Sequence, residues 1–343
     1  MKKYVSLIAT IIIITICLFS CLFFFRPERF NPAQSNPNGA QSDQLTKNNH
    51  YPVTIQNYNY AKEPINITFE KAPEKVLAVY QNSIEILLAL GLEDKILVAA
   101  GLDHPVKPEF KGAFEKIDYL DRAPDKETVI MMQPDFILSW YSFFGEKTMG
   151  EVNYWHENGV NTFMMRNSGA TANRTLENEY EDILDIGKIF DVEEKAQKLV
   201  DDMKAEINKA IAYATAEKSN QRVLIIDYLG QNIRVYGKTT LAGDMAIKIG
   251  ANLITPEGNS IGAEDIITYN PDVLFIIYMD ANNTGVAKDR VSSIIDDPKY
   301  ASLSVVETGR VYPVMLGEVY CSGVRTYDGI VTFAKGLYPE LYK

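Results

Sequence analysis

Apolar residues recur with helical spacing between Asp191 and Lys218. Glycine and proline are absent from this stretch, and Asp191 stands where the N-cap of a helix is expected. The apolar positions follow an i, i+3, i+4, i+7 order: Ala196, Leu199, Val200, Met203, Ile207, Ala210, Ile211 and Ala214. The pattern predicts one long amphipathic helix over residues 191–218. Because strand-like runs lie on both sides, we predict that this helix connects two lobes; the alternative is a long helix within one larger domain.

Residues 51–190 alternate between strand-like and helix-like patterns, and residues 219–343 repeat that alternation. Residues 51–70 alternate apolar and polar positions, which is typical of a hairpin. Alternating strands and helices predict βα units around mainly parallel sheets, and hence an α/β fold. The strands are expected at 75–80, 96–100, 136–140, 162–165, 222–227, 273–278 and 310–314, and the helices at 82–90, 126–132, 150–158, 175–189, 241–249, 263–269, 291–295 and 326–337.

The two predicted lobes share one segment residue by residue. Glu127 to Leu138 aligns with Glu264 to Phe275 at a constant offset of 137 residues. A glutamate, two aliphatic residues, an amide, a Pro-Asp pair and an apolar strand recur in register. Such agreement is hard to obtain by chance, so the sequence indicates two duplicated βα lobes around the long helix.

The first 25 residues read as a targeting or anchoring segment. Lys2 and Lys3 precede an apolar run over residues 4–25, and Leu18 to Cys21 resembles a lipobox whose cysteine would be cleaved and lipidated. The alternative is an uncleaved transmembrane anchor. Both place the folded part outside the cytoplasm, because the lysines stay inside. Residues 26–50, rich in Asn, Gln, Ser and Pro, predict a flexible tether.

Composition narrows the function classes. A chain of 343 residues suffices for two domains, and a formal net charge of −11 argues against nucleic acid as a partner. Apart from Cys17 and Cys21 in the N-terminal run, Cys321 is the single thiol, so no disulfide framework is expected. With only three histidines (His50, His104 and His156), a bare-metal receptor is disfavoured. Catalytic and phosphate-binding motifs are absent, and we expect neither enzymatic activity nor a cofactor.

Ligands of open α/β sheets bind beyond the carboxyl ends of the strands. Aromatic and arginine side chains gather at the predicted ends; aromatic faces suit a large planar ligand, and arginine forks suit carboxylate or catecholate oxygens. The candidate ligand-binding residues are Tyr80, Gln81, Asn82, His104, Trp140, Tyr141, Arg166, Tyr228, Tyr278 and, in the loop Glu318–Arg325, Tyr320 and Arg325.

Three motifs together resemble the cluster A, or class III, substrate-binding proteins of ABC importers. They are ITFEKAPEKVLAV (67–79) followed by SIEILLALGLEDKI (83–96), the duplicated helix–Pro-Asp–strand unit, and SGVRTYDGIVTFAKGLYPE (322–340). The resemblance covers residues 51–343. It implies two Rossmann-like lobes, a rigid connecting helix and a ligand cleft between the lobes, in receptors for ferric siderophores, haem or cobalamin.

The resemblance also implies partners. We expect a monomer, anchored to the cell membrane on its extracytoplasmic face, that delivers a ferric siderophore to an ABC permease dimer with its ATPase. Arg166 and Arg325 would contact the oxygens of the chelate, and Glu127 and Glu264 would dock to permease arginines, although both glutamates also suit helix N-terminal capping. Cobalamin and haem are the alternative ligands, and haem stays open because Tyr320 or His104 could serve as its axial ligand. An extracellular enzyme or partner-binding module on the same scaffold is the alternative from another class.

Overall fold

The computed structural model of the protein describes residues 50–229, 232–280 and 284–343. The predicted anchor segment 1–25, with Cys21, and the tether up to residue 49 lie outside the described residues. Within the described ranges, no helix is both long and apolar enough to cross a membrane. Both lobes belong to one compact unit of the chain.

The N-terminal lobe is built on a five-stranded parallel sheet, which follows the antiparallel hairpin expected at 51–70, formed by β1 (Val53–Tyr58) and β2 (Pro64–Phe69). The central strands are short and wholly buried, as apolar runs in a sheet covered on both faces should be. The sheet order is β5 (Tyr119–Leu120), β4 (Ile96–Ala100), β3 (Val76–Val79), β6 (Phe136–Ser139) and β7 (Asn161–Met164). The helices are α2 (Gln81–Ala89), α3 (Lys111–Phe114), α4 (Lys126–Met132), α5 (Val152–Glu157) and α6 (Leu176–Ile189).

The C-terminal lobe carries a mixed sheet. Four of its strands pair in parallel: β8, β10, β12 and β13. Strand β9 pairs antiparallel with β8, and β11 pairs antiparallel with β9. The sequence did not predict β9 or β11. The strands are β8 (Arg222–Leu229), β9 (Asn232–Val235), β10 (Asn252–Leu253), β11 (Ser260–Ile261), β12 (Val273–Tyr278) and β13 (Val311–Met315). The helices are α8 (Leu241–Lys248), α9 (Ala263–Tyr269), α10 (Val286–Ile295), α11 (Ser304–Glu307) and α12 (Thr326–Leu337).

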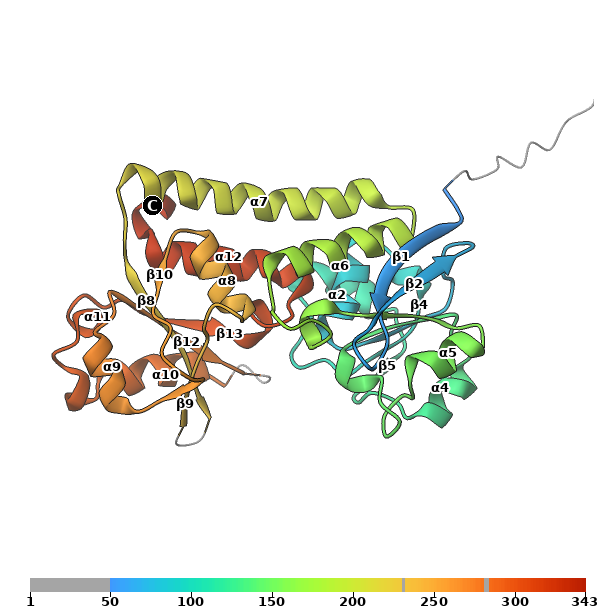
Figure 1. The fold of residues 1–343 in the computed structure, drawn as a ribbon, viewed down its shortest axis with the longest axis horizontal. Coiled ribbons are helices and arrows are strands. Elements are labelled where there is room, and N and C mark those ends of the chain that lie inside the picture. The colour runs from blue at the N-terminus through green and yellow to red at the C-terminus, as the bar shows by residue number, and fades with distance from the viewer. Residues whose placement is uncertain (1–49, 230–231, 281–283) are drawn as a thin grey trace, which may run out of the picture. The chain divides into compact units, whose positions relative to one another are not determined.

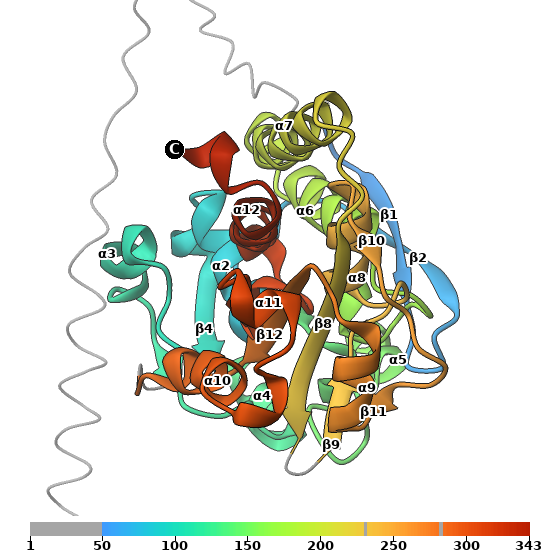
Figure 2. The same cartoon turned by 90° about the vertical axis from the view of Figure 1, so that its left-hand side faces the viewer.

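The connecting helix α7 spans Glu193–Ala216, 24 residues or about 36 Å at ~1.5 Å per residue. It runs along both lobes and lies against α6 and α12 (Figures 1 and 2). Its buried positions all belong to the predicted apolar face: Ala196, Val200, Met203, Ile207, Ala210 and Ala214. The predicted N-cap is wrong, because Asp191 has a left-handed backbone (φ 57°) and Val192 takes the N-cap position. The Asp191 carboxylate instead lies 3.3 Å from His50 Nδ1.

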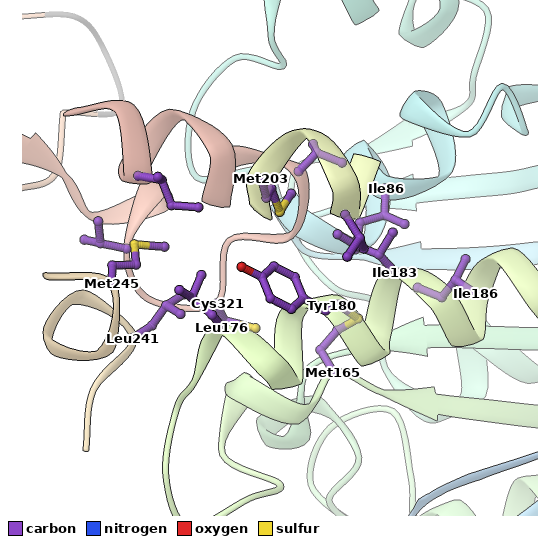
Figure 3. Packing of buried hydrophobic residues seen from close by; sticks show 14 of the residues in the cluster. Ile86, Met165, Leu176, Tyr180, Ile183, Ile186, Met203, Leu241, Met245 and Cys321 are labelled. Carbon is purple, nitrogen blue, oxygen red and sulfur yellow. The ribbon is translucent and has the colours of Figure 1, made fainter. Parts of the chain in front are cut away.

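A single hydrophobic cluster joins the two lobes through α7. Figure 3 shows Met203 of α7 among side chains of α6, such as Ile183, and of α8, such as Met245. The approach of α7 to α6 is close: a Cβ at Gly187 would collide with the Ala196 side chain, so this position of α6 requires glycine. Because the lobes share one core, separating them would expose apolar surface.

The duplicated segment has the same structure in both lobes. Helices α4 and α9 each end in a left-handed residue, Gln133 (φ 53°) and Asn270 (φ 36°), before the Pro-Asp pair. The Asp135 carboxylate accepts hydrogen bonds from the backbone N–H groups of residues 74 and 75, both at 2.8 Å, just before β3. The Asp272 carboxylate accepts from the Arg222 N–H at 2.7 Å, where β8 begins. Each aspartate therefore ties its helix–strand turn to the start of a neighbouring strand.

We predict that Asp135→Ala and Asp272→Ala each lower the free energy of unfolding by about 1–3 kcal/mol, because each leaves backbone donors without their acceptor. Urea unfolding followed by circular dichroism measures this loss. The matched control is Asp121→Ala, which removes an exposed aspartate and should change stability by less than about 0.5 kcal/mol. Equal stability of all three variants would contradict the proposed role of the two aspartates.

Candidate functional site

A cavity of about 270 Å³ lies between the lobes, at the carboxyl ends of their strands. In the N-terminal sheet the cavity lies beyond the end of β3. The strand order runs outward from β3 in both directions, and open α/β sheets bind ligands at such a point. The N-terminal lobe lines it with Tyr80, Gln81, Asn82, Asp103, His104 and Trp140, and the C-terminal lobe with Arg234, Met279, Asp280, Met315, Leu316, Gly317, Tyr320, Cys321 and Ser322.

Three aromatic rings form a wall of the cavity that crosses from one lobe to the other. The ring centroids of Tyr80 and Trp140 are 3.8 Å apart, and the Trp140 ring lies nearly parallel to that of Tyr320 at 5.8 Å. The Trp140 Nε1–H donates to Asn82 Oδ1 at 2.6 Å, and Asn82 Nδ2 donates to Cys321 Sγ at 3.2 Å. These bonds fix the indole ring, so the wall exists before any ligand arrives.

Tyr80 holds an unusual backbone at the turn from β3 into α2. Its φ of 84° and ψ of 159° belong to a region that residues with a side chain rarely adopt, and such strain gathers at functional sites. Its hydroxyl donates to the Asp103 carboxylate. Burial, reinforced by this carboxylate, raises the pKa of Tyr80, so the phenol stays protonated at neutral pH.

His104 closes one side of the cavity against Gly317 of the opposite lobe. A Cβ at Gly317 would lie 2.5 Å from His104 Nε2, so only glycine permits this approach. The other ring nitrogen, Nδ1, lies 3.2 Å from the Pro105 carbonyl oxygen, and Nε2 is buried without a partner within the described part of the chain. Burial, followed by the charge of Arg325, lowers the pKa of His104, which makes the ring neutral at pH 7.

Arg234 brings the one guanidinium among the residues that line the cavity. Its Nη2 donates to the Asp227 carboxylate and to the Tyr236 hydroxyl, both at 2.6 Å, which fixes the side chain. Its Nε is buried and has no hydrogen-bond partner within the described residues. The side chain nevertheless keeps 35% of its surface exposed, so the guanidinium as a whole can still meet an acceptor on a ligand.

Two buried carboxylates of the N-terminal lobe hold the segment of the C-terminal lobe that follows Tyr320. Glu179 accepts hydrogen bonds from the backbone N–H groups of Ser322 (3.2 Å) and Gly323 (2.6 Å). Glu85 forms a two-point ion pair with Arg325, with N–O distances of 2.6 and 2.7 Å. The geometry between the two cavity walls is therefore set by polar contacts as well as by the shared core.

A direct metal site is not formed by the described cavity-lining residues. The one group of His, Cys, Asp and Glu side chains found close enough to share an ion, across the residues that the structure describes, is His50, Asp191 and Glu193. It lies at the start of α7 and lines no part of the cavity. The cavity lining combines aromatic faces and one guanidinium with the carboxylates of Asp103 and Asp280.

A family model described as "Periplasmic binding protein" matches residues 76–314, which include both sheets. The chain belongs to the periplasmic binding protein family. This is the family of ABC-importer receptors that the sequence motifs resemble. The identification also accounts for the two lobes and the connecting helix, and it agrees with the predicted fold class.

Individual relatives of this periplasmic binding protein support the assignment. An uncharacterized ABC transporter substrate-binding lipoprotein, YvrC of Bacillus subtilis (strain 168), is 24% identical over the full length of both chains. A periplasmic binding protein from Veillonella parvula DSM 2008 is 32% identical, with a TM-score of 0.80 over 85% of this chain and 93% of that one. The periplasmic catecholate-siderophore binding protein VctP from Vibrio cholerae shares the fold at 15% identity, with a TM-score of 0.62 over 82% of this chain and 99% of that one.

The structure brings together part of the predicted site. Six of the predicted ligand-binding residues line the cavity: Tyr80, Gln81, Asn82, His104, Trp140 and Tyr320. Their contact with a ligand stays a prediction. Both predicted arginines need correction, because neither lines the cavity. Arg166 is buried against α6, where it pairs with Asp182 at 2.7 Å and Asp185 at 2.6 Å, and Arg325 is engaged by Glu85. Their charges are used within the protein.

Three predicted tyrosines also lie outside the cavity lining. Tyr141 begins a short 3₁₀ helix and stacks on Tyr60 of the hairpin, with ring centroids 4.9 Å apart. Tyr228 packs against the hydrophobic cluster on the other face of the C-terminal sheet, below the guanidinium of Arg290. Tyr278 ends β12, and the cavity lining begins only with the next residue, Met279. Successive side chains of a strand point to opposite faces, so a position at the strand end does not by itself place a side chain in the cleft.

Most of the cavity-lining residues that were not predicted lie at or just after the ends of predicted strands. Met279 and Asp280 continue β12, and Met315 to Gly317 continue β13. The same strand-end rule would have found them. Arg234 lies on β9, a four-residue antiparallel strand, and the sequence offered no signal for it.

Glu318, next to Gly317, is a largely buried carboxyl whose Oε2 accepts a hydrogen bond from Thr332 Oγ1 at 3.2 Å. Burial, reinforced by the nearby Asp328, raises the pKa of Glu318 to about 7. A carboxyl whose pKa is raised by folding stabilises the protein when protonated, and this contribution is lost as the pH rises from the unfolded pKa towards 7.

We therefore predict that Glu318→Gln gains stability relative to the wild type as the pH is raised from about 5 to about 8, by roughly 2–3 kcal/mol. The neutral amide carries no charge to desolvate at the higher pH. Chemical unfolding at a series of pH values measures the difference, with the exposed Glu307→Gln as the matched control. Parallel stability curves for wild type and Glu318→Gln would show that the Glu318 pKa is not raised.

Proposed function

We propose that this periplasmic binding protein is the extracytoplasmic receptor of an ABC importer and that it captures a ferric siderophore, an anionic Fe(III) chelate. The observation that carries the proposal is the cavity between the lobes, with its aromatic wall and the guanidinium of Arg234. The fold shared with the catecholate-siderophore binding protein from Vibrio cholerae supports it. In this proposal the protein is no enzyme and has no cofactor, because iron arrives inside the chelate and needs no protein ligand.

The wall and the guanidinium suit complementary parts of such a chelate. Stacked aromatic faces bind a flat, largely apolar ring system at little cost in side-chain order, because Trp140 is already fixed by Asn82. Arg234 would donate to a catecholate or carboxylate oxygen, forming a charge-assisted hydrogen bond. Asp227 holds the guanidinium in place while 35% of the side chain stays exposed.

Haem is the second candidate, and one contact favours it. Arg174 Nη2 donates to the Tyr320 hydroxyl at 2.7 Å, and the guanidinium lies 4.3 Å from the centre of the Tyr320 ring. A tyrosine oxygen is a known protein ligand of haem iron, and the contact with Arg174 fixes the position of this hydroxyl. His104 is the weaker axial candidate, because its Nε2 is buried against Gly317.

We further propose that the protein is held at the outer face of the cell membrane by a lipid on Cys21. The Bacillus subtilis relative, a lipoprotein by name, supports this. The alternative, an uncleaved anchor over residues 4–25, differs in the N-terminal residue of the mature protein, which is Cys21 in one case and Met1 in the other. The mass of the membrane-extracted protein distinguishes them.

Glu127 and Glu264 are proposed to dock the receptor onto its permease. Both are exposed, at matching places near the starts of α4 and α9. The capping hydrogen bonds are made by other residues, since Asp125 accepts from the Thr128 N–H in α4 and Asp265 accepts from the Gly262 N–H in α9, although both glutamates lie in the first turn, where a carboxylate also favours the helix dipole. Within the described residues neither glutamate side chain has a recorded ion pair, so both charges are available to a partner.

We predict that Arg234→Gln weakens binding of the ferric siderophore by about 10- to 100-fold, the loss expected for one charge-assisted hydrogen bond of roughly 1.5–3 kcal/mol. The measurement is a fluorescence titration in a Trp155→Phe background, where Trp140 is the single tryptophan left. The ligand panel contains catecholate, hydroxamate and carboxylate siderophores with iron, together with haemin and cobalamin.

The matched control is Arg222→Gln, which alters an exposed arginine at the opposite end of β8 and should leave affinity unchanged. Binding of haemin or cobalamin alone would overturn the siderophore assignment. Equal affinity of Arg234→Gln and the wild type for the siderophore would remove Arg234 from the site.

We predict that the double variant Glu127→Arg, Glu264→Arg abolishes uptake while its ligand affinity stays that of the wild type. Charges at the rim of an interface mainly steer association, and reversing them replaces attraction by repulsion. Uptake of iron-loaded siderophore by cells, alongside the fluorescence titration, provides both readouts. Normal uptake by this variant would contradict the docking role. Loss of ligand binding would show that the two glutamates have a structural role instead.

A further inference from the structure

Each of the two glutamates is followed, three residues later on the same helix, by an exposed isoleucine. Ile130 on α4 is 44% exposed and Ile267 on α9 is 38% exposed. The two isoleucines are separated by the same 137 positions as Glu127 and Glu264. Residues three apart in a helix lie on one face, so each lobe presents a carboxylate beside a branched apolar side chain.

Packing within the described part of the chain does not account for these isoleucines. The apolar contact of each helix with its own lobe is made by the preceding residue, Val129 or Ile266, and both of these are wholly buried. A large apolar side chain exposed on each of two repeated helices is a feature of surfaces that bind other proteins. Met131, which is 76% exposed, enlarges the patch of the N-terminal lobe.

The two helices that carry the patches lie on the same side of the molecule. Figures 1 and 2 both draw α4 and α9 on the side of the lobes away from α7. A partner that approaches from that side can meet both helices at once. Because the repeat gives the lobes matching patches, the fitting partner has two matching surfaces of its own.

We propose that Glu127 with Ile130, and Glu264 with Ile267, form two composite docking contacts for a two-fold symmetric membrane permease, each half of which offers a cation beside an apolar recess. This proposal rests on the docking role proposed above and adds an apolar component to it. A second copy of this chain fits less well, because patch against patch would bring like-charged carboxylates together.

The carboxylates and the isoleucines affect different steps of docking. The carboxylates act at a distance and raise the rate of encounter, which falls as salt screens them. The isoleucines act only after contact, when their burial removes apolar surface from water, so they set how long the complex lasts. The charge alone would give a fast but short-lived encounter.

The test is binding of the ligand-loaded receptor to its permease and ATPase in lipid nanodiscs, followed by surface plasmon resonance at several salt concentrations. We expect Ile130→Ser, Ile267→Ser to raise the dissociation rate at least about tenfold, with the association rate and its salt dependence nearly unchanged. The Glu127→Arg, Glu264→Arg variant should instead lower the association rate. The matched control is Ile247→Ser, because Ile247 on α8 is 44% exposed and belongs to neither patch.

The outcomes separate this proposal from the one on which it rests. If the wild type does not bind the permease at all, the proposed function itself fails. If the wild type binds and the double serine variant dissociates at the same rate, the glutamates can still dock but the composite contact is overturned. A wild-type dimer in analytical ultracentrifugation that the serine changes dissolve would assign the patches to self-association and would also overturn the proposal. Unchanged ligand titration by Trp140 fluorescence shows that the serine variant is folded.

Discussion

The buried carboxylates Glu85 and Glu179 hold the two lobes in register. Both belong to the N-terminal lobe, and each accepts hydrogen bonds from one short segment of the other lobe, which contains Ser322, Gly323 and Arg325, in addition to donors of its own lobe. A buried carboxylate deprived of its donors costs several kcal/mol, so this arrangement tolerates little separation. Together with the shared hydrophobic cluster along α7, it fixes the two walls of the cavity relative to one another.

The aromatic wall depends on the same segment. Tyr320 and Cys321 stand immediately before the residues that Glu179 binds, and they place one ring of the wall and the thiol that receives a hydrogen bond from Asn82. Asn82 in turn orients Trp140. Asn82 thus links Cys321 of the C-terminal lobe to the indole ring of Trp140. The position of Trp140 in the N-terminal lobe therefore depends on a residue more than two hundred positions away in the sequence.

Sequence reasoning found what local patterns encode. The buried face of α7 follows from apolar spacing, and the paired lobes follow from the repeat that contains Asp135 and Asp272. The charges at the strand ends were misjudged because their partners are set by tertiary structure. Arg166 meets Asp182 only once α6 packs beside it, and Arg325 meets a carboxylate 240 residues away. Arg234 was out of reach, since a four-residue antiparallel strand leaves almost no periodic signal.

The repeated aspartates mark the amino ends of the sheets, far from the ligand, and there the two lobes still agree residue by residue. At the carboxyl ends the cavity-lining residues differ: Trp140 corresponds to Ile277 at the same offset, and Met279 and Asp280, which line the cavity after β12, correspond to Ser142 and Phe143, which do not. The two lobes are therefore nearly symmetric at the amino ends of their sheets, whereas the two walls of the cavity differ. A bound molecule thus has one orientation relative to the lobes. A partner built of two equal halves could receive such a receptor in either of two poses related by a half turn. Because the half turn is about the axis that relates the partner's two halves, the same end of the cargo leads in both poses, and only its orientation around that axis differs.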